Sequence, residues 1–126
     1  MSGDARPRLL FDLHADADAG AAGPGVRWRL DETGRQLDAN ALSLAPGQHI
    51  DTHTEADLDV LLVVVDGGGT LGTEDEPLAL APGTLAWLPR GSTRSLTAGA
   101  DGLTYLTVHR RRPGMRIGPP PEDNLR

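Results

Sequence analysis

The sequence predicts an all-β protein, a small sandwich or barrel around one core. Segments with strand character recur at intervals of roughly ten residues, and turns such as Pro46-Gly47 and Pro82-Gly83 separate them. No stretch carries a convincing helical period. A chain of 126 residues with 38% hydrophobic residues is long enough for one core and too short for two ordinary domains.

The first informative stretch follows Pro46-Gly47. From there the polar residues His49, Asp51, His53 and Glu55 occupy every second position. Because alternate side chains of a strand point to the same face, this spacing predicts four polar groups on one surface. A polar pocket lined by this strand is the expectation.

Six aliphatic residues, 60–65, come next, and three glycines, 67–69, follow them. The run is short and rich in valine, which predicts a strand buried on both faces. One wall of a lone barrel should face water and alternate. We therefore expect a cover for the outer face of this strand, and a homodimer is the commonest way to provide it. The terminal segments 9–13 or 115–117 could supply part of the cover.

Flanking segments complete the prediction. Val26, Trp28 and Leu30 alternate with Arg27 and Arg29, which predicts a half-buried strand. This strand and residues 35–44 are expected to form a hairpin. Further strands are predicted at residues 78–81, 84–88, 94–97 and 103–108. We divide the chain into an N-terminal segment at 1–25 with an ordered apolar patch at 9–13, a barrel at 26–110, and a C-terminal arm at 111–126.

Composition excludes several classes of function. Cysteine is absent, which removes disulfides, thiolate metal sites and cysteine nucleophiles. Twelve basic against eighteen acidic residues give a formal net charge of −6, which argues against a nucleic-acid partner. No signal-peptide core or membrane-length apolar run is present, so a soluble cytoplasmic protein is expected, with no membrane partner. The sequence also contains no nucleotide-binding fingerprint, no phosphate-binding loop and no nucleophile paired with a base.

A family resemblance begins at Gly47. Five residues separate it from His53, Glu55 follows, and Gly67 comes later. This spacing resembles the first motif of the cupin superfamily, G-x5-H-x-H-x(3,4)-E-x6-G. In that family the two histidines and the glutamate of this motif are metal ligands.

The second half of the resemblance lies at residues 83–94. Gly83, Pro89, Gly91 and Arg94 resemble the second cupin motif, G-x5-P-x-G-x2-H-x3-N. The start of the second motif at Gly83 comes sixteen residues after the end of the first at Gly67, as in short single-domain cupins. The resemblance implies a cupin-type double-stranded β-helix, or jelly-roll barrel, in a single conserved-barrel domain.

The metal-ligand positions of the family are degenerate in this chain. His53 keeps the expected residue, whereas Glu55 stands at the second histidine, Val60 at the glutamate, Arg94 at the second-motif histidine, and Ala98 at the asparagine. A guanidinium that cannot lose its proton competes with a cation for the same space. The sequence therefore favours a barrel without the standard metal.

A different ligand set is the alternative. His53 and Glu55, with His49 or Asp51 as replacements, could hold one divalent first-row ion such as Fe, Mn, Ni or Zn. Asp59 could join only if the entry of its strand is bulged, because a shift of one residue turns a side chain to the other face. Under this interpretation the protein would be a metal-dependent isomerase, cyclase or dioxygenase.

Arg94 carries the preferred interpretation. If its side chain points inward like the family's histidine, burial requires a partner. The sequence predicts an ion pair with Glu55 in the volume where relatives hold a metal. A small organic molecule, for example an anionic one, would then bind by engaging Arg94.

Several other residues could serve either the pocket or only the structure. Tyr105 and His109 lie four apart on the last predicted strand, so both could face the pocket. Trp28 and Trp87 are expected in the core, since the chain has few aromatic residues. The basic run 110–112 is expected to be a solvated exit from the last strand. A binding protein, a metal-free or metal-dependent enzyme and a ligand-free structural barrel all remain open.

Overall fold

The computed structural model describes residues 5–14 and 24–112, and this part of the chain contains seven β-strands. No helix of the described residues is long and apolar enough to cross a membrane. The strands are β1 (Gly25–Arg29), β2 (Leu37–Leu44), β3 (His49–Thr54), β4 (Val60–Gly72), β5 (Leu78–Leu80), β6 (Leu85–Leu88) and β7 (Thr93–Arg110).

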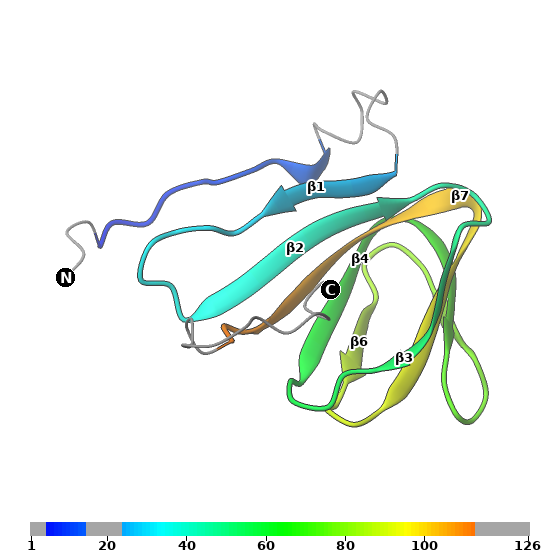
Figure 1. Ribbon diagram of the computed structural model, residues 1–126. Helices are drawn as coiled ribbons and strands as arrows, with labels where there is room; N and C mark the ends of the chain where they lie inside the picture. Colours follow the sequence, from blue (N-terminus) through cyan, green and yellow to red (C-terminus); the bar gives the residue numbers. More distant parts are fainter. Residues whose placement is uncertain (1–4, 15–23, 113–126) are drawn as a thin grey trace.

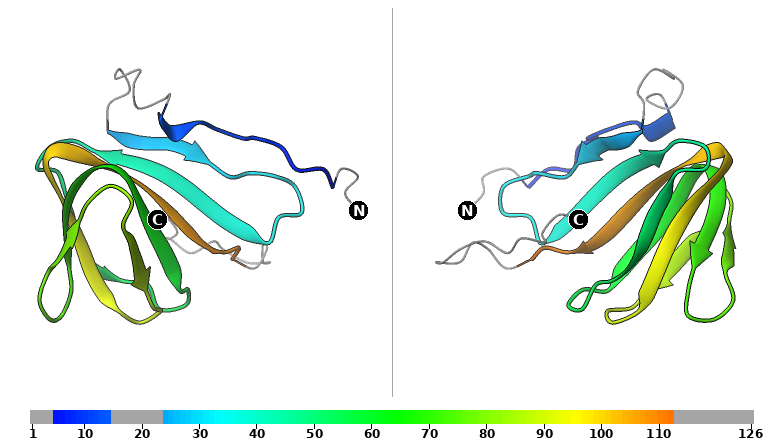
Figure 2. Two further views of the ribbon diagram at one scale, coloured as in Figure 1. Left: turned by 180° about the vertical axis from the view of Figure 1, so that it is seen from behind. Right: turned by 45° about the vertical axis from the view of Figure 1, so that its right-hand side comes forward.

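The strands form two layers that share β4 and β7. In the first layer the order is β1, β2, the second half of β7, the first half of β4, and β6. In the second layer it is β3, the first half of β7, the second half of β4, and β5. Figures 1 and 2 show both long strands bending from one layer into the other. All pairings among the described strands are antiparallel, and the all-β prediction is confirmed.

Two strands are longer than the sequence predicts. The prediction ended one strand at residue 65 and placed a turn at residues 98–102, but β4 continues through its glycines and β7 is continuous. The reason is that these glycines mark bends with shifts of register, between Val64 and Asp66 and between Gly67 and Gly69. A bulge of this kind bends a strand without ending it.

The glycines of β4 allow its backbone to approach β7 closely. A Cβ atom at Gly69 would lie 2.1 Å from the carbonyl oxygen of Thr97, and one at Gly67 would lie 2.1 Å from that of Gly102. Gly67 also has a φ of 72°, a conformation that other residues seldom adopt. Close contact at this crossing therefore depends on the missing side chains.

The core lies between the two layers. Its buried side chains are mainly leucines and valines from every strand of the two layers except β1 and β3, together with Leu58 from the β3–β4 loop. On β4 the inward residues Val60, Leu62 and Val64 are buried. The alternate positions 61, 63 and 65 are only half-buried, so the prediction of a strand buried on both faces is correct for the inner face alone.

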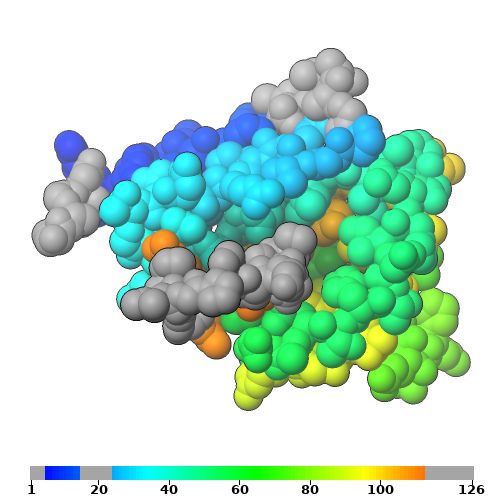
Figure 3. Space-filling view, viewed as in Figure 1, coloured from blue at the N-terminus to red at the C-terminus, as the bar shows by residue number. Residues whose placement is uncertain are grey.

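The predicted hairpin of the N-terminal half is present. β1 pairs with β2, and the ring of Trp28 stacks on Phe11 of the preceding segment at a centroid distance of 6.1 Å. In the space-filling view the blue and cyan atoms of this region form one flank of the molecule, and the green and yellow strands form the other (Figure 3). Trp87, expected in the core, is instead 61% exposed on β6.

We predict that Gly69→Ala strongly destabilises the fold. The added methyl group has no room beside the Thr97 carbonyl, and relief requires the two strands to separate. We expect a loss of at least about 3 kcal/mol in the free energy of unfolding. Gly99→Ala is the matched control, because its Cβ would meet the nearest atom at an ordinary 3.4 Å. Equal denaturant midpoints for the two variants would contradict the close approach.

Candidate functional site

One end of the barrel is built by two loops bonded to each other. The amide of Gly91 donates to the carbonyl oxygen of Glu55 at 2.8 Å. The amide of Arg90 donates to the carboxylate of Asp59 at 2.9 Å, and its guanidinium makes an ion pair with the same carboxylate at 3.2 Å. These bonds fix the β3–β4 loop against the β6–β7 turn, and Asp59 is thereby used as a structural partner.

A bulge in β3 changes the predicted arrangement of polar residues. Ile50 lies opposite Leu96 of β7, but His53 lies opposite Arg94, so β3 has one extra residue between the two pairs. Residues directly opposite in a ladder share a face, and one inserted residue reverses the side-chain alternation. The prediction that the four alternate residues line one surface is therefore wrong.

The two histidines of β3 consequently lie on opposite faces. His49 is opposite Thr97, on the outer side, and its Nδ1 lies 2.9 Å from the Thr97 hydroxyl. Its Nε2 lies 3.3 Å from the exposed carboxylate of Asp51. His53 is on the side of Arg94, exposed at the open end, with Nδ1 3.0 Å from the carbonyl oxygen of Asp51.

Arg94 points inward, in the same row as the buried Leu96 and Ala98, and only 7% of its surface is exposed. Its Nη1 donates to the hydroxyl and the carbonyl oxygen of Ser92 at 3.1 and 3.4 Å. Burial lowers the pKa of the guanidinium, and the nearby charge of Glu55 offsets this effect in part. In the part of the chain that the structure describes, Arg94 is therefore a buried cation whose hydrogen-bond partner, Ser92, is neutral.

The Glu55 carboxylate, predicted to pair with Arg94, pairs with Arg112 instead. Its Oε1 lies 2.5 Å from Nη2 of Arg112, and its Oε2 accepts a bond from the amide of Asp57 at 2.8 Å. Burial alone would raise the pKa of Glu55, but the Asp57 amide and the Arg112 guanidinium outweigh burial and hold it below its ordinary value. The predicted direct ion pair between Glu55 and Arg94 is thus wrong within the described residues.

Sequence reasoning missed the role of Arg112 in this site. It lies 57 positions after Glu55, beyond the end of β7, in a basic run that was expected to be solvated. The antiparallel course of β7 brings the residue back over the barrel end. The run of arginines at 110–112 was the feature of the sequence that could have indicated a cationic partner for Glu55.

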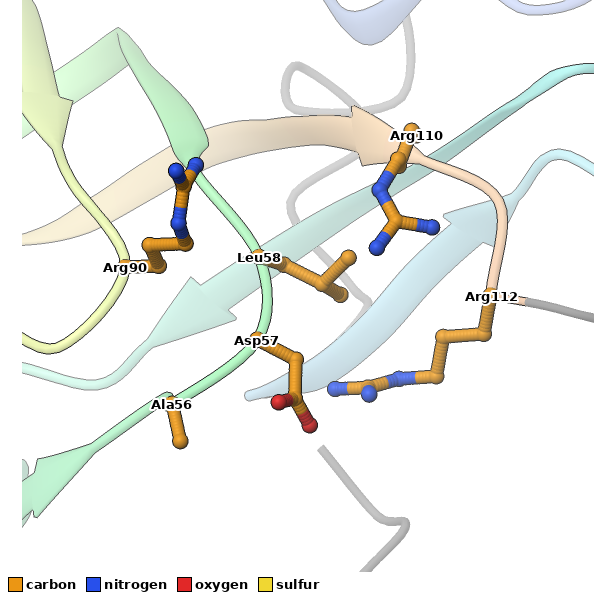
Figure 4. A pocket seen from close by; sticks show the side chains of 6 residues that line it. All are labelled: Ala56, Asp57, Leu58, Arg90, Arg110 and Arg112. Carbon is orange, nitrogen blue, oxygen red and sulfur yellow. The ribbon is translucent and has the colours of Figure 1, made fainter.

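Two adjoining hollows open at this end, of about 370 and 250 Å³. Arg90, Arg110 and Asp57 line both of them, and the buried Leu58 lines the larger one. Figure 4 shows Arg90 on one side of the Leu58 segment, with Arg110 and Arg112 on the other. The hollow therefore lies at the rim of the barrel, above an interior filled by leucines, rather than deep within it.

Of the two polar candidates on β7, Tyr105 lies inside the barrel and His109 lies near the end of the strand. Tyr105 is buried opposite Val64, and burial raises the pKa of its phenol to about 12. His109, four residues on and half-buried, faces the same side, with Nδ1 2.8 Å from the carbonyl oxygen of Arg110. The phenol therefore stays neutral and can act as a hydrogen-bond donor.

The donor set does not fit the alternative of a metal centre. Among residues 5–14 and 24–112 no three His, Asp or Glu side chains come together in a way that could hold an ion. The physical reasons are that His49 and His53 face opposite sides, and that Glu55 is engaged with a guanidinium. A first-row metal needs several converging donors.

Comparisons with known proteins concern the fold. Protein-family models and curated protein sequences give no match. Among solved structures, a protein from Thermus thermophilus has a TM-score of 0.66 at 22% identity, with 82% of this chain and 98% of that one covered. A cupin-2 domain protein from Shewanella frigidimarina has the same TM-score at 15% identity, with 81% and 95% covered.

The chain has the cupin fold.

Other solved structures similar to this chain belong to differently named proteins. The Cnp3 cupin domain of Schizosaccharomyces pombe has a TM-score of 0.60 at 12% identity over 68% of this chain, which spans 59% of that protein's length. KdgF from a Halomonas species has a TM-score of 0.59 at 23% identity, with 68% of this chain and 77% of that one covered. Likeness at these identities establishes the double-stranded β-helix, and the function has to be argued from the site.

We predict that the contribution of Glu55 to stability depends on pH. Its pKa is lower in the folded than in the unfolded state, so its contribution is present above the unfolded pKa of about 4 and is lost as pH falls through the folded value. Because Arg112 is half-exposed, we expect Glu55→Gln to cost at most ~1 kcal/mol at pH 7.

Chemical denaturation from pH 7 down to pH ~3 measures this dependence. The unfolding free energies of the parent and of Glu55→Gln should converge at the acidic end. Asp51→Asn provides the control at an almost fully exposed carboxylate. A constant difference between parent and Glu55→Gln across this range would contradict an ionised, paired Glu55.

Proposed function

We propose that this protein binds a small organic anion at the arginine-lined end of its cupin barrel, with the Arg94 guanidinium in place of a metal ion. The observation that carries the proposal is that the buried Arg94 guanidinium has no anionic partner within hydrogen-bonding distance among the described residues. Buried charges are normally paired, since an unpaired one is costly. A ligand carboxylate would supply the missing charge.

The free edge of the guanidinium supports this chemistry. Nη1 of Arg94 donates its hydrogen bonds to Ser92, while Nε and Nη2 of Arg94 have no acceptor among the described residues. Every fully buried nitrogen or oxygen of the described side chains has a hydrogen-bond partner. Because Nε and Nη2 of Arg94 have none, they are not fully buried and reach solvent. Nε and Nη2 lie side by side and match the two oxygens of a carboxylate.

The surroundings favour an anion as well. Arg94 lines neither hollow itself, but Arg90, Arg110 and Arg112 line the larger one at the same end of the barrel, in a chain whose formal net charge is −6. Two of them are neutralised by Asp59 and Glu55. Arg110 has no ion pair in the described part of the chain, so its charge remains available to attract an anion toward the opening.

Glu55 has a defined part in this proposal. It lies near enough to Arg94 to act on it electrostatically, while its carboxylate remains bonded to Arg112 and to the Asp57 amide. An arriving anion would therefore meet Arg94 with its free edge open. His53, opposite Arg94 in the ladder, the buried Tyr105 and His109 near the end of β7 are the polar groups that would contact the rest of the ligand.

We predict that Arg94→Met removes anion binding without destabilising the free protein. Replacing a buried charge by an apolar side chain of similar length should leave the free energy of unfolding unchanged or raise it by up to ~2 kcal/mol. The probes are acetate, succinate and gluconate, with glucose as the neutral counterpart. Binding is measured by calorimetry and by the shift in melting temperature that a ligand of the folded state produces.

A matched control is Arg35→Met, which removes a half-buried arginine paired with Asp38 outside the site. We expect it to retain any binding of the parent protein. The proposal fails if no carboxylate in the panel shifts the melting temperature, or if Arg94→Met binds the same anion as tightly as the parent. A marked loss of stability in Arg94→Met would instead make Arg94 a structural residue.

A further inference from the structure

The Glu55 carboxylate lies close to two guanidinium groups and is bonded to one of them. Its Oε1 lies 2.5 Å from Nη2 of Arg112, and its Oε2 accepts a bond from the amide of Asp57 at 2.8 Å. Arg94 is the second group. Burial lowers the pKa of Arg94, and the nearby charge of Glu55 acts against that effect. The carboxylate is therefore already bonded, although an alternative partner lies close by.

The backbone places Glu55 beside the residues that the Arg94 guanidinium contacts. Glu55 comes directly after β3, and its carbonyl oxygen accepts a bond from the amide of Gly91 at 2.8 Å. Nη1 of Arg94 donates to the hydroxyl of Ser92, the residue after Gly91, at 3.1 Å. Side chains one diagonal step apart on facing strands can meet when one of them is long. A rotation of the Glu55 side chain could therefore bring its carboxylate to the free edge of Arg94.

Arg112 reaches Glu55 from a different part of the chain. It lies two positions beyond the end of β7, and Figure 4 shows its side chain extending toward the loop that carries Asp57. The rest of the predicted C-terminal arm, including the cover for β4 expected at 115–117, lies outside the described residues. The contact with Glu55 thus depends on where β7 ends, whereas the pairing of β3 with the start of β7 positions Arg94.

We infer that Arg112 is a positioning residue, which keeps the edge of Arg94 open to a ligand by holding the Glu55 carboxylate away from it. This role rests on the anion-binding function proposed above. Without Arg112, Glu55 loses its guanidinium partner and turns to Arg94, because a buried guanidinium and a nearby carboxylate favour pairing. The ion pair that the sequence predicts would then form, and it would occupy the edge that a ligand carboxylate needs.

The expected effect on affinity follows from competition for Arg94. A ligand binds the molecules in which this edge is open, so the apparent affinity falls in proportion to their fraction. If Glu55 covers Arg94 in roughly nine tenths of the molecules, the affinity falls about tenfold. In the parent protein the bonds to Arg112 and to the Asp57 amide keep the open fraction high.

Anion binding by a set of variants tests the inference. Acetate, succinate and gluconate are titrated into each variant by calorimetry. We expect Arg112→Met to bind about tenfold more weakly than the parent. Arg112→Lys should retain binding, because it keeps a cation beside Glu55, and Arg112→Met combined with Glu55→Gln should recover it.

Arg111→Met is the matched control for the loss of charge. It removes the same charge one position earlier, and the amide of Arg111 keeps its 2.8 Å bond to the carbonyl oxygen of Gln36. If Arg112 acts through Glu55, Arg111→Met should bind like the parent. If the arginines act only as a shared positive field, both variants should weaken binding equally.

Unfolding without ligand gives a second test, which does not depend on anion binding. In the parent, Arg94→Met is expected to leave the denaturant midpoint unchanged or to raise it. In the Arg112→Met background the same substitution should lower the midpoint, because Glu55 then has neither guanidinium partner. Adding Glu55→Gln to that background should remove the loss. Such a change of sign reports a contact between Glu55 and Arg94 that forms once Arg112 is gone.

The two tests separate this inference from the proposed function. If the parent binds no carboxylate in the panel, the proposed function fails, and a change of sign in the midpoints would still establish that Arg112 controls the contact between Glu55 and Arg94. Equal binding by the parent and Arg112→Met would overturn the inference, as would equal weakening by Arg111→Met. The same midpoint shift for Arg94→Met in both backgrounds would also overturn it, because a released Glu55 would then not turn to Arg94.

Discussion

The close crossing of β4 and β7 is the constraint on which the rest of this protein depends. Both strands belong to both layers, and they can bend around each other only because Gly67 and Gly69 present no side chain to the facing carbonyl oxygens. Once the two strands are fixed, β2 and β3 pair with β7, while β5 and β6 pair with β4. Register at the crossing therefore determines which residues face inward everywhere else.

The candidate site follows from this register. The first half of β7 presents Leu96 and Ala98 to the core, and the same alternation places Arg94 inside at the open end. The bulge in β3 then sets His53 beside it and turns His49 away. A histidine pair on one face would have favoured a metal. One guanidinium with an open edge favours a carboxylate.

Electrostatics at the barrel end separate two kinds of arginine. Arg90 and Arg112 hold loops in place by pairing with Asp59 and Glu55. Arg94 has the neutral Ser92 as its only hydrogen-bond partner within residues 5–14 and 24–112. Structural charges are normally neutralised where they stand, whereas a functional site often retains an uncompensated one. This contrast is the physical basis for assigning binding to Arg94.

Much of the fold could be predicted from sequence, because alternation and turn residues identify strands locally. Both long strands were cut short in the prediction, since a glycine that ends a strand looks the same as Gly69, which permits a close approach. Family motifs correctly indicated an inward Arg94. The partner of Glu55 could not be predicted, because Arg112 reaches it through tertiary structure and the β3 bulge leaves no mark in the sequence.

Metal content of the untagged protein tests the exchange of a metal ion for a guanidinium most directly. Elemental analysis after purification should find well below one first-row ion per chain, because His53 has no converging donors among the described residues and Arg94 occupies the family's fourth ligand position. One tightly held ion per chain, retained through dialysis against a chelator and lost in His53→Ala, would contradict it.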